Sequence, residues 1–92
     1  MKKCIKVIFE AVDAQKVLEN FIAKQAEKHK VEGIGQKIKE ETIQLYVCGQ
    51  EEQVEDFIDS LYLGTTQIKL ENIIIETCPT DRSYRGVFRI VE

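Results

Sequence analysis

The sequence predicts an α+β fold in which two helices cover one face of an antiparallel sheet. Three observations predict it. Apolar residues alternate in several short segments, two longer segments carry apolar residues at helical spacing, and the segments follow the order strand, helix, strand, strand, helix, strand, with a short fifth strand at the end. The 92 residues suffice for one hydrophobic core, so we expect a single domain over residues 1–92.

The first strand and the first helix have the clearest patterns. Apolar and more polar positions alternate over residues 2–10, which is typical of a strand packed on one side. From Ala14 the apolar residues recur at helical spacing, and this pattern fades near His29. Asp13 immediately precedes the segment, and we interpret it as the helix N-cap.

The middle of the chain predicts two further strands joined by a turn. Two glycines mark an irregular second strand over residues 33–39, where the backbone can need angles that glycine permits. Two glutamates at 40–41 supply a turn into a third strand over 42–48, where apolar residues alternate regularly.

The C-terminal half repeats the alternation of helix and strand. A second helix is expected after Gln50 and ends at Gly64, and acidic residues in its opening turns complement the helix dipole. An isoleucine-rich fourth strand is expected over 68–77, and Pro79 closes it off. After a polar loop, a short final strand is expected over 87–91. The complete order is the split βαβ arrangement of ferredoxin-like folds.

Composition narrows the classes of partner. Sixteen acidic and thirteen basic side chains give a formal net charge of −3, so nucleic acid and anionic membrane are disfavoured as partners. No segment approaches the roughly 20 apolar residues of a membrane span. The N-terminal apolar run is too short for a signal-peptide core, so we expect a cytoplasmic protein.

The cysteines and the one histidine predict no metal site and no cofactor. Cys4, Cys48 and Cys78 include no Cys-x-x-Cys pair, and in a cytoplasm we expect them to be reduced structural thiols. His29 has no nearby Cys, Ser or Asp partner motif. We interpret it as a helix-end histidine that is favourable to the dipole.

Several segments resemble one known family. Residues 49–58, Gly-Gln-Glu-Glu-Gln-Val-Glu-Asp-Phe-Ile, followed by Gly64 and Thr65, resemble the second helix of acylphosphatases and its exit. Residues 84–90, Tyr-Arg-Gly-Val-Phe-Arg-Ile, resemble the terminal strand of that family. The resemblance covers nearly the whole chain. It implies the family's α/β sandwich, which agrees with the predicted order of elements.

The resemblance also implies a reaction and two catalytic positions. Acylphosphatases hydrolyse carboxyl-phosphate bonds, holding the phosphate with one arginine and with a glycine-rich loop after the first strand, while an asparagine orients the attacking water. Phosphoryl transfer needs such donors because negative charge must be stabilised. When the chain is aligned with the family without gaps, backward from Ala26, the family's arginine position falls on Glu19. When it is aligned forward from Gly33, the asparagine position falls on Lys37. No arginine precedes Arg82, so a shift of register does not restore the pair.

These departures change the charge expected around the phosphate site. The loop after the first strand lacks the family's glycines, and Glu10, Asp13 and Glu19 are expected to place three negative charges there. Lys16 and Lys37 offset them in part and are the candidate anion-binding residues. The competing interpretation is that both lysines are solvated and pair with surface carboxylates.

We therefore expect an acylphosphatase-like domain that is catalytically inactive and that acts by binding a protein partner or a second copy of itself. The last loop, with Arg82, Tyr84 and Arg85, is the candidate partner-contact loop, and local pairing of its arginines is the alternative. Asp81 belongs to the same cluster.

Two further hypotheses stay open. One is an acylphosphatase whose remodelled site takes its cations from Lys16, Lys37 or the last loop. The other is binding of a small ligand or RNA on the open sheet face, where Tyr46, Lys6 and Arg89 are expected to gather, although the long basic-aromatic motif of RNA-recognition domains is absent.

Overall fold

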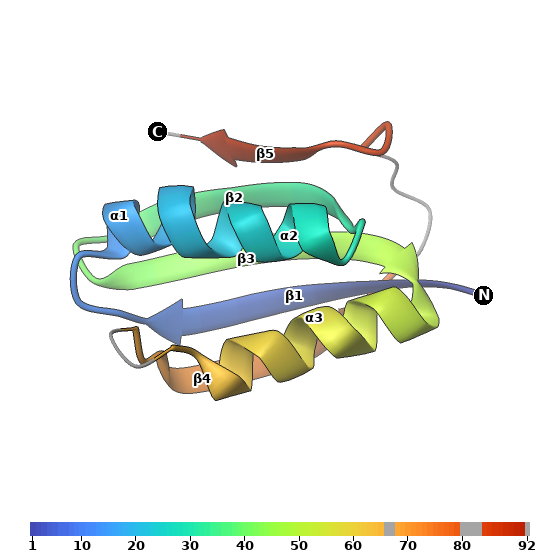
Figure 1. The fold of residues 1–92 in the computed structure, drawn as a ribbon. Helices are drawn as coiled ribbons and strands as arrows, with labels where there is room; N and C mark the ends of the chain where they lie inside the picture. Colours follow the sequence, from blue (N-terminus) through green and yellow to red (C-terminus); the bar gives the residue numbers. More distant parts are fainter. Residues whose placement is uncertain (66–67, 80–83, 92) are drawn as a thin grey trace.

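The computed structural model describes residues 1–65, 68–79 and 84–91. Its sheet contains five strands in the spatial order β4-β1-β3-β2-β5, and the helices pack on one face of it (Figure 1). The strands are β1 (Lys2–Glu10), β2 (Glu32–Lys39), β3 (Thr42–Gln50), β4 (Glu71–Cys78) and β5 (Phe88–Val91). Strand β5 pairs parallel to β2, whereas the other neighbours are antiparallel. The predicted α+β split βαβ fold is confirmed, with a sheet that is mixed rather than purely antiparallel.

The first helix is continuous but changes its pitch. It consists of α1 (Ala14–Val17), a turn of π geometry, η1 (Leu18–Ile22), and α2 (Ala23–Lys28). The wider turn carries three of the helix's buried residues, Leu18, Phe21 and Ile22. The helix ends as predicted at His29, whose backbone N–H donates a 3.0 Å hydrogen bond to the carbonyl oxygen of Gln25.

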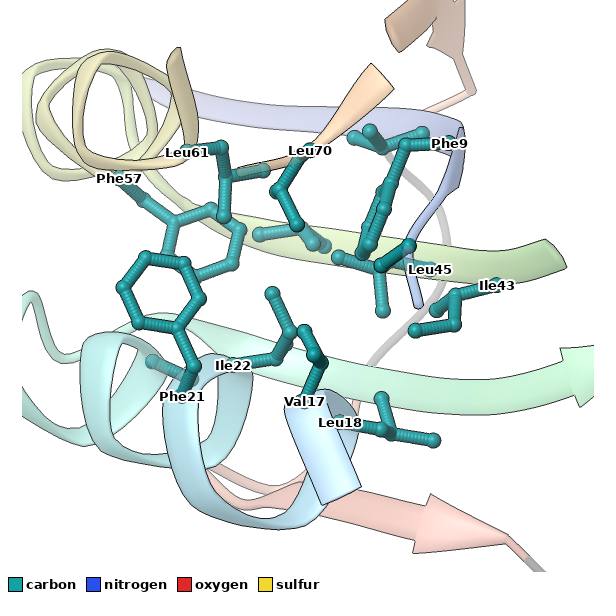
Figure 2. Packing of buried hydrophobic residues seen from close by; sticks show 14 of the residues in the cluster. Phe9, Val17, Leu18, Phe21, Ile22, Ile43, Leu45, Phe57, Leu61 and Leu70 are labelled. Carbon is teal, nitrogen blue, oxygen red and sulfur yellow. The ribbon is translucent and has the colours of Figure 1, made fainter. Parts of the chain in front are cut away.

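The core lies between the sheet and the single layer that the two helices form. The second helix is α3 (Glu51–Leu63), and Figure 2 shows Phe57 and Leu61 from this helix directed toward Phe21 and Ile22 of the first helix. The sheet contributes alternate residues of its two central strands, with the side chains of Phe9, Val7, Ile43 and Leu45 fully buried. Burial of apolar area on this face is the main stabilising term.

Turn chemistry decides where the C-terminal elements begin. Gly64 ends α3 with φ 59°, and a Cβ there would lie 2.4 Å from the carbonyl oxygen of Ile68. Thr65 and Ile68 then close a turn, in which Thr65 N–H donates to Ile68 O at 2.9 Å. Strand β4 therefore begins at Glu71, later than the predicted residue 68.

The expectation that all three cysteines are reduced thiols is wrong for two of them. Cys4 on β1 and Cys48 on β3 are Cα partners in the antiparallel register and form a disulfide across 44 residues of sequence. Their spacing in the sequence gives no sign of this, because the strand register alone brings them together. Cys78 is a half-buried free cysteine.

Within residues 1–65, 68–79 and 84–91, no helix is long and apolar enough to cross a membrane.

Candidate functional site

The connection between β1 and the first helix forms one wall of the candidate site. Ala11 N–H donates a 2.9 Å hydrogen bond to Glu41 O, which ties this connection to the turn between β2 and β3. Asp13 follows with a left-handed backbone, φ 56°, and its carbonyl oxygen accepts from Val17 N–H at 3.0 Å. Asp13 thus holds the predicted N-cap position, but it caps through its backbone, since its side chain makes no capping hydrogen bond.

A cleft of about 490 Å³ opens beside this connection. Lys16 and Lys69 line it together with the carboxylates of Asp13 and Glu71, and Asn20 adds an amide. The formal charges of these four ionisable groups cancel, so the cleft does not concentrate positive charge as a phosphate site requires. The remaining described lining is apolar and comprises Ala11, Val12, Val17 and Ile68.

The opposite wall comes from the segment that leads into β4. Leu70 is 9% exposed and belongs to the hydrophobic core, which fixes the segment against the molecule. Lys69 and Glu71 flank Leu70, so both side chains leave the core side of the chain and reach the cleft. Sequence reasoning missed these two residues and Asn20. The one signal in the sequence that places Lys69 and Glu71 on the same side of the chain is their position on either side of the apolar residue Leu70.

The predicted site residues separate in the structure. Lys16 lines the cleft, whereas neither Glu19 nor Lys37 is among the described lining residues. Glu19 is exposed, and its Oε2 accepts a 2.8 Å hydrogen bond from Nε2 of Gln15, one helical turn earlier. Lys37 is exposed on β2 opposite Ile43, at the same end of the sheet as the cleft.

The three expected negative charges lie at different places around the cleft. Glu10 alternates with the buried Phe9 along β1, so it belongs to the opposite face of the sheet from the helices. The carboxylates that line the cleft are Asp13 and Glu71, and Glu71 is the Cα partner of Glu10 on the neighbouring strand. Which carboxylates line the cleft depends on the alternation of side chains along the strand and on the path of the segment preceding β4, and not on proximity in the sequence.

The candidate partner-contact loop lies beside β2 and β5. Tyr84, Arg85 and Arg89 line a shallow hollow of about 330 Å³ together with Gly33 and Ile34. Arg82 and Asp81, which were expected in the same cluster, lie outside the described residues.

Glu32 at the start of β2 fixes this turn. Its Oε2 accepts hydrogen bonds from the backbone N–H groups of Tyr84 and Gly86, the latter at 3.4 Å. Its Oε1 lies 4.0 Å from Nζ of Lys2. One carboxylate therefore joins the N-terminal strand, β2 and the turn before β5.

The hollow and the cleft lie at opposite ends of the sheet. Glu32 pairs with Cys48, which pairs with Cys4 near the start of β1, whereas the cleft follows Glu10 at the end of β1. At the usual rise per residue, these two points are roughly 20 Å apart along the strand. Arg85 therefore does not supply a cation to the cleft.

The open face of the sheet carries a mixed row of side chains. The register places Arg89, Ile34, Tyr46, Lys6 and Glu76 next to one another across all five strands. The predicted gathering of Tyr46, Lys6 and Arg89 on one face is confirmed. Glu76 opposes Lys6 directly, so the row is not uniformly basic.

Among the residues that the structure describes, no group of His, Cys, Asp or Glu side chains is arranged to hold a metal ion.

Solved structures with the same fold include two bacterial acylphosphatases. An acylphosphatase from Coxiella burnetii superposes with a TM-score of 0.80 at 21% identity, covering 98% of this chain and 93% of that chain. One from Bacillus subtilis gives a TM-score of 0.79 at 20% identity and covers both chains fully (100%). Full-length HypF in its phosphate- and nucleotide-bound form gives 0.81 at 17% identity, covering 100% of this chain but 12% of that chain.

These structural similarities show the fold. No curated protein matches the chain by sequence. The sequence model of the acylphosphatase family matches residues 17–90, which is most of the chain and runs from the end of α1 into β5. The chain therefore belongs to the acylphosphatase family.

Proposed function

We propose that this chain is an acylphosphatase-family domain that does not hydrolyse acyl phosphates and that acts in the cytoplasm by binding. The observation that carries the proposal is the composition of the cleft. Two lysines are offset there by the carboxylates of Asp13 and Glu71, and none of its described lining residues is an arginine. A transferring phosphoryl group needs concentrated positive charge and preorganised donors, which a neutral cleft does not supply.

The loop and the helix support the same conclusion. Residues 11–17 contain no glycine. Glycine permits the backbone angles that usually form a cradle of N–H groups around a phosphate, so this loop has fewer ways to form one. The family match begins at Val17, after this loop. Glu19, aligned with the family's arginine, is hydrogen-bonded within its own helix. The resemblance predicts that these are the residues that contact phosphate in the family.

A hydrolysis assay tests the loss of activity. Turnover of benzoyl phosphate should be absent in the parent and should appear in the Glu19→Arg/Lys37→Asn variant, which restores the family's pair. Glu55→Arg, which makes the same charge change as Glu19→Arg at an exposed site on α3, should stay inactive. Turnover by the parent at a rate that substitution of Glu19 changes would contradict the proposal.

The binding role is proposed for the edge of the sheet. Strand β4 is an edge strand, and Ile74 on it is 55% exposed. An unpaired strand edge with an exposed apolar side chain can pair with another chain, either a protein partner or a second copy. Sedimentation of the parent should show dimers that Ile74→Lys removes and that Tyr62→Lys, at an exposed position on α3, leaves intact. A monomer at every concentration would exclude self-pairing and leave a different protein as the partner.

Residual acylphosphatase activity is the second candidate, because Lys16, Lys69 and Asn20 converge on one cleft of sufficient size for a small anion. In this case the parent would turn over benzoyl phosphate, and Lys16→Ala or Lys69→Ala would remove the activity. Lys24→Ala, an exposed lysine on the same helix as Lys16, would not.

Binding of a small ligand or RNA is a third candidate, based on the row that contains Tyr46, Lys6 and Arg89. Salt-sensitive RNA binding, or a ligand-induced rise in melting temperature, that Tyr46→Ala abolishes would support it. Absence of both effects would reject it.

A further inference from the structure

Three cysteines lie in one row across the sheet. Cys4 on β1 is the Cα partner of Cys48 on β3 and also the Cα partner of Cys78 on β4. Residues in the same row direct their side chains to the same face of a pleated sheet, here the face without helices. The central sulfur of Cys4 therefore has a cysteine on each side.

The three cysteines differ in access to solvent. Cys4 and Cys48 form the disulfide and are each 2% exposed, whereas Cys78 is a half-buried free thiol on the edge strand. All three line a cavity of about 280 Å³, together with Tyr46, Pro79 and Tyr84. A small thiol or disulfide can reach Cys78 through this cavity, but the disulfide itself is shielded by the protein.

The strand geometry allows either neighbour to bond to Cys4. The Cα atoms of Cys4 and Cys48 are 4.1 Å apart, which is the close, non-hydrogen-bonded pairing of antiparallel strands. A strand residue directs its N–H and C=O toward one neighbour, so the pairing of Cys4 with Cys78 is the wider, hydrogen-bonded one, with Cα atoms about 5.5 Å apart. This separation lies within the range that disulfides bridge.

We propose that Cys4, Cys48 and Cys78 form a thiol–disulfide exchange site that takes low-molecular-weight thiols and disulfides, with Cys78 as the residue that meets them. In the first step, the thiolate of Cys78 attacks Sγ of Cys4. The Cys4–Cys78 bond forms as the Cys4–Cys48 bond breaks, and the electron pair leaves on Sγ of Cys48, which takes up the proton that Cys78 lost. Nothing is oxidised or reduced overall.

The second stage connects the pair to solution. A small thiolate attacks Sγ of Cys78, forms a mixed disulfide there and releases Cys4 as a thiolate, which is then protonated. A second small thiolate attacks the small molecule's own sulfur in that mixed disulfide and releases Cys78. The protein disulfide has gained two electrons and two protons, and the two small thiols have become one disulfide. The reverse sequence oxidises the buried pair with a small disulfide.

Single-cysteine substitutions test the arrangement directly. After reduction, the full chain with Cys48→Ser is treated with oxidised glutathione and mapped by mass spectrometry, and we expect an internal Cys4–Cys78 bond. The matched control, Cys4→Ser, leaves Cys48 and Cys78 two strands apart, about 10 Å, which exceeds the reach of a disulfide. The control should keep glutathione on Cys78. Glutathione on Cys78 and no internal bond in the Cys48→Ser chain would overturn the proposal.

Reduction kinetics supply a second readout that uses the intact disulfide. Reduced glutathione should open the Cys4–Cys48 bond at least tenfold faster in the parent than in Cys78→Ser. The two chains are compared at urea concentrations that give equal free energies of unfolding, which removes differences in global opening. Equal rates under these conditions would show that the bond opens by unfolding and not through Cys78, and would overturn the proposal.

Discussion

Nε2 of Gln15 donates a 2.8 Å hydrogen bond to Oε2 of Glu19, the residue that we predict to occupy the position of the phosphate-binding arginine of acylphosphatases. The bond connects two side chains on the same helix face, one turn apart. Glu19 is therefore held by its own helix, and the charges that line the cleft come from other residues. The cleft's behaviour toward anions consequently depends on Asp13, Lys16, Lys69 and Glu71.

Removing the two carboxylates of the cleft should create anion affinity. We expect Asp13→Asn/Glu71→Gln to bind inorganic phosphate several-fold more tightly than the parent, since each neutralised carboxylate contributes roughly 0.2–1 kcal/mol at such partly solvated sites. Asparagine tolerates the left-handed backbone of residue 13, so the loop should keep its shape.

Amide chemical shifts of Lys16 during a phosphate titration measure this affinity. Glu55→Gln, which removes a carboxylate on α3 near Lys3, is the control and should leave the affinity unchanged. Equal affinity in the parent and the double variant would mean that the cleft is not where phosphate binds.

The disulfide should supply a large share of the stability. Closing a loop of 44 residues removes entropy from the unfolded chain equivalent to about 4 kcal/mol in the chain-entropy description. We expect a reductant to lower the urea midpoint of the parent strongly. The Cys4→Ser/Cys48→Ser chain should start at the lower midpoint and should not respond to reductant. A parent whose midpoint does not change once its disulfide is fully reduced would contradict this expectation.

Gly35 should tolerate no larger side chain. A Cβ at this position would lie 2.8 Å from Cδ1 of Leu18 and 2.9 Å from Cδ2 of Leu45, both in the core. Gly35→Ala should therefore destabilise the domain by about 1–3 kcal/mol through overpacking. Gly49→Ala is the control, because its Cβ would make ordinary contacts of 3.4 Å or more. Similar midpoints of urea unfolding for the two variants would be inconsistent with the close contact at Gly35.

The Glu32 carboxylate should hold the turn before β5. It accepts hydrogen bonds from the backbone N–H groups of Tyr84 and Gly86, so Glu32→Ala leaves these donors without their partner. Faster hydrogen exchange is expected at both amides, corresponding to a local loss of about 1–3 kcal/mol for hydrogen bonds to a charged group. Glu55→Ala should leave these exchange rates unchanged. Unaltered rates in Glu32→Ala would show that other contacts hold the turn.

The sequence by itself determined the elements and their order. The alternation of apolar and polar residues over β1 and β3 is a local pattern, and so is the helical spacing of apolar residues over the two helices. Gly64 and Pro79 mark the ends of elements, and these ends depend on the backbone chemistry of single residues. The resemblance to acylphosphatases rested on short segments of the same kind. The same alternation predicted that Tyr46, Lys6 and Arg89 share one face of the sheet.

The tertiary structure alone decided which distant residues meet. Lys69 joins Lys16 in the cleft because a turn after α3 and the burial of Leu70 return the chain to the end of β1. Cys4 meets Cys48 and Cys78 because the strand order and register put them in one row. A shift of one residue in register moves every side chain of a strand to the other face, and no local pattern in the sequence specifies the register between strands that are far apart in the chain.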